Sequence, residues 1–285
     1  MKNKYFTMIV IVVPVIMLFC FEAYIYSIKD KSALINSVIS VRESNVNCLI
    51  MGDSHTEQSF RGNIKECVNL SVGGATIPMI ADAIYSVEKN NDLKLVVIPL
   101  DPHNFSEYRL NNYTTMYKDI ATQNKLLLTI PILKKIAINK IKSSLREKEI
   151  EKGWIDYSSQ ERQESLDGRL KKHLKIQKFE STNYSKIYKE LVKYLINKDI
   201  KVYLVRTPVI PEYEKKIFEY IGYDRWKKYV NSFTLIGANY IDYKFLEFNY
   251  KNNSMFENQD HLNKEGAKIF SKIFSKNFID DKHNY

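Results

Sequence analysis

Cysteine is scarce in this chain, with three residues among 285, and their positions exclude the cysteine-rich classes of protein. No two cysteines have the short separation of a zinc-binding or redox motif, so we expect neither kind of centre. Cys20 lies in an apolar N-terminal run, whereas Cys48 and Cys67 lie in predicted strands. A disulfide between Cys48 and Cys67 is conceivable in an oxidising compartment. We nevertheless expect two buried free thiols.

The chain also lacks the signatures of a nucleic-acid-binding protein. It has no RNA-binding motif and no compact basic block, so we expect no nucleic-acid partner. Lysine and arginine together number 43 against 33 acidic residues, which gives a net charge of +10. Such an excess favours anionic partners such as anionic lipid or an acidic cell-wall polymer. The alternative is a lysine-rich composition spread over solvated faces.

Internal repeats and low-complexity linkers are absent as well. Hydrophobic residues make up 45% of the chain, a share that excludes disorder on grounds of composition. A chain of this length is therefore expected to form one large domain with its own core.

A long apolar run near the N-terminus predicts a membrane anchor. Residues 6–26 read FTMIVIVVPVIMLFCFEAYIY and follow Lys2 and Lys4. About 20 apolar residues suffice to cross the hydrocarbon core as a helix. A cleavable signal peptide is the main alternative, but its apolar core is usually shorter and no small-residue cleavage site follows closely. We expect a single-pass signal anchor within residues 1–30 and an extracytoplasmic domain over residues 31–285.

Beyond this run, short apolar segments alternate with helical patterns. The segments are apolar on both faces, which is typical of strands in a buried parallel sheet. The expected strands cover residues 47–53, 66–71, 93–101, 200–209 and 239–243. The expected helices cover residues 77–91, 184–199, 212–232 and 263–278. This order predicts an α/β fold, a three-layer α/β/α domain with a central parallel sheet of the flavodoxin type.

Residues 106–180 interrupt the alternation. Their first half is basic and amphipathic, and a polar, charged stretch follows it. We interpret residues 106–180 as a helical, basic insertion or lid. It could lie on the membrane surface or cover the sheet.

Polar residues and glycines follow the predicted strands, at the edge where open parallel sheets place their sites. The candidates are Gly52, Asp53, Ser54, His55, Gly73, Gly74, Asp101, His103, Asn104, Asp260 and His261. They include the parts of an acyl-transfer site: a serine nucleophile, a histidine base, and backbone or amide donors for an oxyanion.

Ser54 lies in the stretch LIMGDSHTEQ and has two interpretations. With Glu57 it forms the S-x-x-E pattern of a capping box, so it could be a structural N-cap. It could equally be a nucleophile, because a helix N-terminus stabilises an oxyanion there. Asp53 is expected to be a backbone-bonding turn residue, His103 to be structural, and the role of His55 is open.

A metal site is the competing explanation for these side chains, since several are hard oxygen and nitrogen ligands. The residues concerned are Asp53, His55, Asp101, His103, Asp260 and His261. A metallophosphoesterase needs further Asp, Asn and His blocks, including a GNH-type motif, and the chain lacks them. We expect neither a metal nor a cofactor.

The blocks GDSH, NLSVGGAT, PHN and DHLNKEGA, in this order, resemble the SGNH (GDSL-type) hydrolase superfamily over roughly residues 47–278. The nearest resemblance is to membrane-anchored bacterial SGNH proteins linked to O-acylation of surface polymers, including teichoic-acid D-alanylation. The resemblance implies that Ser54 is the nucleophile and His261 the base. It also implies that Ser54, Gly74 and Asn104 donate hydrogen bonds to the oxyanion.

The chain departs from this family at the acid. The family places an aspartate three residues before the histidine, where this chain has Asn258. The side-chain oxygen of an asparagine could still accept a hydrogen bond from the imidazole, with weaker support for its charged form. Asp260 and Glu257 are nearby carboxylates. Asp260 is kept as a candidate acid, although adjacent residues of an extended loop point to opposite sides.

The expected function is that of an extracytoplasmic, membrane-anchored serine esterase or O-acyltransferase. Its substrate would be acyl groups of a cell-surface glycan or polymer, and a membrane-bound O-acyltransferase is an implied partner. The alternative is a catalytically weak accessory or binding protein of the same fold in a surface-polymer acylation system. Asn258 favours the alternative, with residues 106–180 as the contact surface.

Overall fold

The structure is a computed structural model that describes residues 38, 41, 45–62, 64, 67–110, 153–175 and 179–279. The predicted anchor within residues 1–30 lies outside the described residues, as does the central part of the predicted insertion. Among the described helices, none has both the length and the apolar character that a membrane crossing requires.

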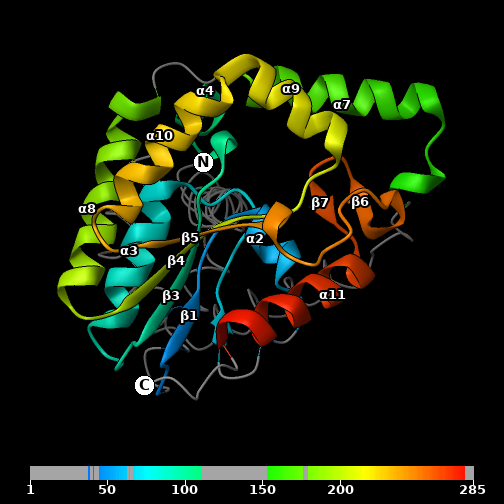
Figure 1. Cartoon of the computed structure of the whole chain (residues 1–285). Coiled ribbons are helices and arrows are strands. Elements are labelled where there is room, and N and C mark those ends of the chain that lie inside the picture. The colour runs from blue at the N-terminus through cyan, green and yellow to red at the C-terminus, as the bar shows by residue number, and fades with distance from the viewer. Residues whose placement is uncertain are drawn as a thin grey trace, which may run out of the picture.

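A parallel sheet of five strands forms the centre of the domain (Figure 1). Its order is β2-β1-β3-β4-β5, the flavodoxin-like arrangement. The strands are β1 (Cys48–Ile50), β2 (Cys67–Asn69), β3 (Leu95–Pro99), β4 (Lys201–Arg206) and β5 (Asn239–Asp242). The predicted α/β fold with a central parallel sheet is confirmed.

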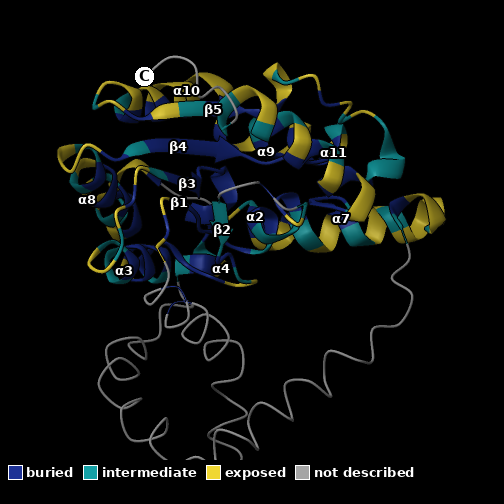
Figure 2. Ribbon diagram, turned by 90° about the horizontal axis from the view of Figure 1, so that it is seen from below, coloured by how far each residue is buried: buried dark blue, intermediate teal, exposed yellow. Residues whose placement is uncertain are grey.

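Helices cover both faces of the sheet, which explains why its strands are apolar throughout. Figure 1 shows α3 and α8 on one face and α2 and α11 on the other. The bounds are α2 (Ser54–Ser59), α3 (Ile77–Glu88), α8 (Asn183–Asn197) and α11 (Lys264–Phe274). Figure 2 shows the central strands and the inner helix faces buried, with exposed residues on the outer faces.

The predicted helix over residues 212–232 is two helices in the structure. They are α9 (Pro211–Ile221) and α10 (Tyr223–Thr234), and they meet at Gly222. Gly222 has φ 80°, a left-handed conformation that glycine adopts without steric cost. The predicted closing helix also differs, because α11 ends at Phe274 and continues as a π-helical turn, η6 (Ser275–Ile279).

A small antiparallel hairpin precedes α11 and was not predicted. It consists of β6 (Phe256–Asn258) and β7 (His261–Leu262), and its register sets Asn258 opposite His261. Residues 256–262 read FENQDHL and contain no apolar run, so the sequence pattern gave no signal for these strands. The hairpin fixes how these two side chains meet.

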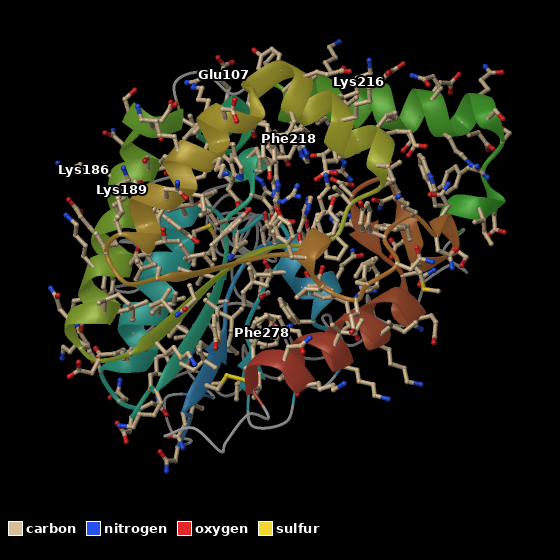
Figure 3. The ribbon with its side chains drawn as sticks, in the orientation of Figure 1. Glu107, Lys186, Lys189, Lys216, Phe218 and Phe278 are labelled. Atoms are coloured by element: carbon tan, nitrogen blue, oxygen red, sulfur yellow. A yellow bond between two sulfur atoms is a disulfide. The ribbon has the colours of Figure 1, made fainter. Side chains whose placement is uncertain are left out.

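Cys48 and Cys67 form a disulfide, so the expectation of free thiols is wrong. The parallel register of β1 and β2 sets the two residues directly opposite each other, with Cα atoms 4.4 Å apart. This separation lies within the range that a disulfide spans. Figure 3 draws the bond in yellow.

Part of the predicted insertion, residues 106–180, is described. It comprises α4 (Glu107–Leu110), η2 (Trp154–Asp156), α7 (Ser159–His173) and η3 (Phe179–Ser181). Helix α7 packs against α9 and α4. Its first turn is closed by a capping box in which Ser158 and Glu161 bond each other's backbone N–H groups. The role of the insertion as a lid stays a prediction.

Candidate active site

The candidate site lies at the carboxyl ends of β1 and β3, where the strand order of the sheet reverses. Crossovers leave these two strands in opposite directions, and in folds of this kind ligands bind beside the loops that follow such strands. Gly52 allows α2 to begin directly after β1, since a Cβ there would lie 2.2 Å from Thr56 Oγ1. Only glycine fits this turn, which places Ser54 at this edge of the sheet.

Ser54 and His261 meet at this edge although 207 positions separate them in the sequence. Ser54 Oγ lies 3.1 Å from His261 Nε2. Ser54 is half-buried as the first residue of α2, and His261 is buried on β7. The distance lies within the range for proton transfer between a hydroxyl and an imidazole.

Asp53, rather than Ser54, is the N-cap of α2. One carboxylate oxygen of Asp53 accepts the His55 N–H at 3.0 Å, as expected for a backbone-bonding turn residue. The interpretation of Ser54 as a structural cap is therefore wrong. Glu57 is also used differently, because its Oε2 accepts the N–H of Gly73 at 2.9 Å. The Ser54 hydroxyl therefore caps no backbone N–H of α2 and contacts His261.

The glycine loop after β2 lies against the nucleophile candidate. A Cβ on Gly73 would lie 3.8 Å from Ser54 Cβ, so the loop passes close to the hydroxyl. The bond from Gly73 N–H to Glu57 holds the loop in place. Gly74 has φ 81° and open space around it. The backbone N–H groups of Ser54 and Gly74 stay the predicted oxyanion donors.

Asn104 is buried and is hydrogen-bonded to Asp53. Its Nδ2 donates to Asp53 Oδ2 at 3.1 Å, and its Oδ1 accepts the N–H of Asp101 at 3.0 Å. Its amide nitrogen is thus already engaged by a carboxylate. The assignment of Asn104 as a third oxyanion donor stays a prediction.

Asp53 is the centre of a buried charge network. Besides Asn104, its Oδ2 accepts from His103 Nε2 at 2.8 Å and from Arg109 Nη2 at 2.9 Å. Burial favours the neutral acid, but His103 and Arg109 outweigh burial and hold the pKa of Asp53 well below its usual range. Burial and the neighbouring His55 lower the pKa of His103 to about 4, so its ring is neutral at pH 7. The network anchors the loops after β1 and β3 to α4.

Asn258 faces His261 with its amide nitrogen. Asn258 Nδ2 lies 3.0 Å from His261 Nδ1, while Asn258 Oδ1 accepts the N–H of Asp260 at 3.1 Å. The expectation that the side-chain oxygen would accept from the imidazole is therefore wrong. The backbone N–H of Asp260 already occupies that oxygen. Burial lowers the pKa of His261 to about 3, so its ring is neutral.

Asp260 lies closer to His55 and Arg169 than to His261. Its Oδ2 lies 3.2 Å from His55 Nε2 and 3.2 Å from Arg169 Nε, whereas its Oδ1 is 3.9 Å from His261 Nδ1. Burial opposes a charge on His55, but the adjacent Asp260 carboxylate outweighs burial and raises the pKa of His55. Asp260 thus favours the charged form of His55, and the guanidinium of Arg169 adds a positive charge beside the catalytic candidates.

Four of the five histidines of the chain gather here, and His283 lies outside the described residues. His55 stacks on His103 with ring centroids 3.8 Å apart and meets His261 edge-on at 4.8 Å. His173 stacks on His103 at 5.2 Å, and its Nδ1 bonds the hydroxyl of Tyr213 at 2.6 Å.

Sequence reasoning missed Arg109, Arg169 and His173. All three lie in the segment interpreted as an insertion, and none belongs to a recognisable motif. The scarcity of histidine was the signal that could have pointed to His173. A residue type used five times in 285 positions invites the question of where each copy lies.

Three of these side chains could hold a metal by type. His55, Asp260 and His261 each offer one ligand atom, and these atoms lie within 4.8 Å of one another. Imidazole and carboxylate are zinc ligands. However, Arg169 places a positive charge 3.2 Å from the same Asp260 oxygen that faces His55. That charge opposes a cation there.

No protein-family model and no curated protein matches the chain. Among solved structures it is similar to a proposed platelet activating factor from Streptococcus pneumonia, with 10% identity and a TM-score of 0.45 over 92% of this chain and 98% of that one. A proposed acylhydrolase from Bacteroides fragilis NCTC 9343 has 11% identity and a TM-score of 0.41 over 82% and 86%. An acetyl xylan esterase has 16% identity and a TM-score of 0.43 over 81% and 99%. Similarities this low identify no activity.

Proposed function

We propose that the protein is a serine esterase or O-acyltransferase of the SGNH type, with Ser54 as the nucleophile that carries the acyl group. The 3.1 Å contact between Ser54 Oγ and His261 Nε2 carries the proposal. A serine hydroxyl bonded to a buried imidazole is the pair that acyl transfer requires. Its place at the switch point of a parallel sheet is where such folds bind ligands.

The reaction has two halves. Ser54 Oγ bonds to the acyl carbonyl carbon while its proton passes to His261 Nε2, and the carbonyl oxygen becomes an oxyanion facing the N–H groups of Ser54 and Gly74. The carbon–oxygen bond to the alcohol then breaks, and the alcohol takes the proton from His261. In the second half, His261 removes a proton from water or from an acceptor hydroxyl. That oxygen attacks the acyl-serine ester, and Ser54 regains its proton. Water gives hydrolysis, and a sugar or polymer hydroxyl gives transfer.

We further propose that this chemistry takes place outside the cytoplasm, on acyl groups of a cell-surface glycan or anionic polymer. The apolar run over residues 6–26 supports an anchor, and the Cys48–Cys67 disulfide supports an oxidising compartment. The net charge of +10 supports an anionic partner. Lys186 on α8 and Lys216 on α9 are exposed and point outward from the domain (Figure 3). A membrane-bound O-acyltransferase is the proposed protein partner.

A second function is favoured by one observation, the Asn258 amide that faces His261 Nδ1. A base without an acid partner abstracts a proton poorly, because the imidazolium that forms is not stabilised. The same fold would then serve as an accessory protein that binds an acylated polymer or an acyltransferase with little turnover of its own.

A fluorophosphonate probe applied to the full chain in detergent micelles separates the two functions. We expect the natural chain to be labelled and Ser54→Ala to remain unlabelled. Ser159→Ala is the matched control, since Ser159 is an exposed serine at the first position of α7, and it should label normally. Replacing the base in His261→Gln should slow labelling.

Two outcomes would contradict the esterase. Labelling that persists in Ser54→Ala would place the reactive group elsewhere. A natural chain that does not label at any pH, yet binds an acetylated polymer, would establish the accessory function instead.

A further inference from the structure

We infer that Asn258 is a positioning residue that locks His261 in the tautomer unable to accept the Ser54 proton, so that the site rests in an inactive state. The inference rests on the proposed function, because it concerns how the same serine and histidine are controlled. It assigns to Asn258 a role opposite to that of an acid, since an acid would hold the competent tautomer.

The orientation of the Asn258 amide is determined by its neighbours. Its oxygen accepts the backbone N–H of Asp260 at 3.1 Å, which leaves its nitrogen 3.0 Å from His261 Nδ1. An amide nitrogen only donates and an amide oxygen only accepts. Rotating the amide by half a turn would set its nitrogen against the N–H of Asp260, and two donors would face each other.

The donor on Asn258 decides where the imidazole proton lies. A neutral imidazole has one donor and one acceptor nitrogen. Because Nδ1 of His261 accepts from Asn258, the ring proton is on Nε2. That nitrogen lies 3.1 Å from Ser54 Oγ and therefore donates to the hydroxyl. A general base must present a lone pair at this position. In the resting state the hydrogen bond between His261 and Ser54 therefore has the wrong direction for catalysis.

Protonating the ring on both nitrogens does not relieve the lock at neutral pH. The N–H on Nδ1 of an imidazolium would face the N–H groups of the Asn258 amide, so two donors would meet. Burial also keeps the pKa of His261 near 3, so the ring does not take up a second proton at neutral pH. The neutral ring in the tautomer protonated on Nε2 is thus the resting form.

Asp260 does not replace the missing acid in this geometry. Its Oδ1 lies 3.9 Å from His261 Nδ1, beyond hydrogen-bond distance. Its other oxygen lies 3.2 Å from both His55 Nε2 and Arg169 Nε, so the carboxylate is closer to these two groups than to His261. Arg169 belongs to helix α7, so this helix helps to keep the Asp260 carboxylate from bonding His261.

A carboxylate at position 258 would reverse the lock without changing the shape of the side chain. One oxygen would accept the N–H of Asp260, as Asn258 Oδ1 does now, and the other would accept a proton from His261 Nδ1. The ring would then present the lone pair of Nε2 to Ser54. The natural chain reaches this state only by rotating the amide of Asn258 against the Asp260 N–H.

Nitrogen-15 NMR of the full chain, with labelled histidine in micelles, reads the tautomer directly. The His261 signals are assigned by their loss in His261→Gln. We expect Nε2 of His261 to carry the proton in the natural chain and Nδ1 to carry it in Asn258→Asp. A natural chain with the proton on Nδ1 would overturn the inference. This readout does not depend on whether Ser54 reacts, so it separates failure of the lock from failure of the proposed function.

Labelling rates with the fluorophosphonate probe give the second readout. We expect Asn258→Asp to react faster than the natural chain by a factor of the order of 10²–10⁴. Asn258→Ala removes the donor without adding an acid, so its rate should equal or exceed the natural rate. Asn253→Asp, with the same charge change in η5 (Asn253–Met255), is the control and should leave the rate unchanged.

The Ala variant also distinguishes a lock from ordinary support. If Asn258 merely held the hairpin, Asn258→Ala would slow labelling and Asn258→Asp would give no gain, and that pair of results would refute the inference.

The pH profile adds a signature, because a carboxylate beside His261 raises its pKa. The acid limb of the labelling rate should move to higher pH in Asn258→Asp. If that variant does not fold, the NMR of Asn258→Ala still decides, since the proton should no longer be confined to Nε2.

Discussion

Removing the Cys48–Cys67 disulfide should lower the free energy of unfolding by about 3 kcal/mol and leave Ser54 reactive. The bond joins the first residues of β1 and β2 and closes a loop with a sequence separation of 19. In the chain-entropy treatment, a loop of this length removes about 11 cal/mol/K from the unfolded ensemble, which gives about 3 kcal/mol at 25 °C. The site lies at the opposite ends of the same strands, so the contact between Ser54 and His261 does not depend on the bond.

Urea unfolding followed by the fluorescence of the buried Trp154 and Trp226 measures the difference. The comparison is made in a Cys20→Ala background, between the oxidised chain and the Cys48→Ala/Cys67→Ala double variant. Reductant should lower the midpoint of the first and leave the second unchanged. A loss below about 1 kcal/mol, or an equal response of the double variant to reductant, would refute the entropic reasoning.

Two further predictions concern the buried carboxylates. In Asp53→Asn, Arg109 and His103 would face an amide instead of a carboxylate. An unpaired buried charge costs about 3–5 kcal/mol, so urea unfolding should show a loss of this size in the free energy of unfolding. A loss below about 1 kcal/mol would contradict this reasoning. Burial raises the pKa of Asp101 to about 7, above the value of about 3.9 for an unfolded chain, so the folded state keeps a proton that the unfolded state releases. The free energy of unfolding should therefore contain a part that falls as pH rises from about 4 to about 7, and this part should vanish in Asp101→Asn. Equal pH dependence of both proteins between pH 4 and 8 would contradict this.

The fold could be predicted because long apolar strands alternate with helices that have clear periodicity. The runs around β3 and β4 are apolar on both faces, which only a covered parallel sheet explains. The break at Gly222 and the hairpin of β6 and β7 were not predictable in this way. A single glycine inside a helical pattern is ambiguous, and the mostly polar residues 256–262 contain no apolar run that would indicate strands.

The candidate site was predictable only as far as topology determines it. The rule that polar residues gather at the carboxyl ends of parallel strands placed Ser54 near Asp101 and Asn104. The contact with His261 followed from the resemblance of two distant blocks. The orientation of the Asn258 amide was out of reach, because it depends on one backbone N–H that the hairpin brings into place. Arg169 and His173 were not predicted as site residues because they lie on a helix without a recognisable motif.

The order of the elements along the chain has a consequence for biosynthesis. The strands β1 to β5 all precede the hairpin, and the hairpin carries His261. Chains are synthesised from the N-terminus, so β1 to β5 emerge before the hairpin. The sheet and the loop with Ser54 can therefore form on the emerging chain before any base is present. Under the proposed function, Ser54 has no base during that interval and gains one only when the hairpin docks against α2, so the onset of Ser54 labelling would report completed folding in a pulse-chase experiment.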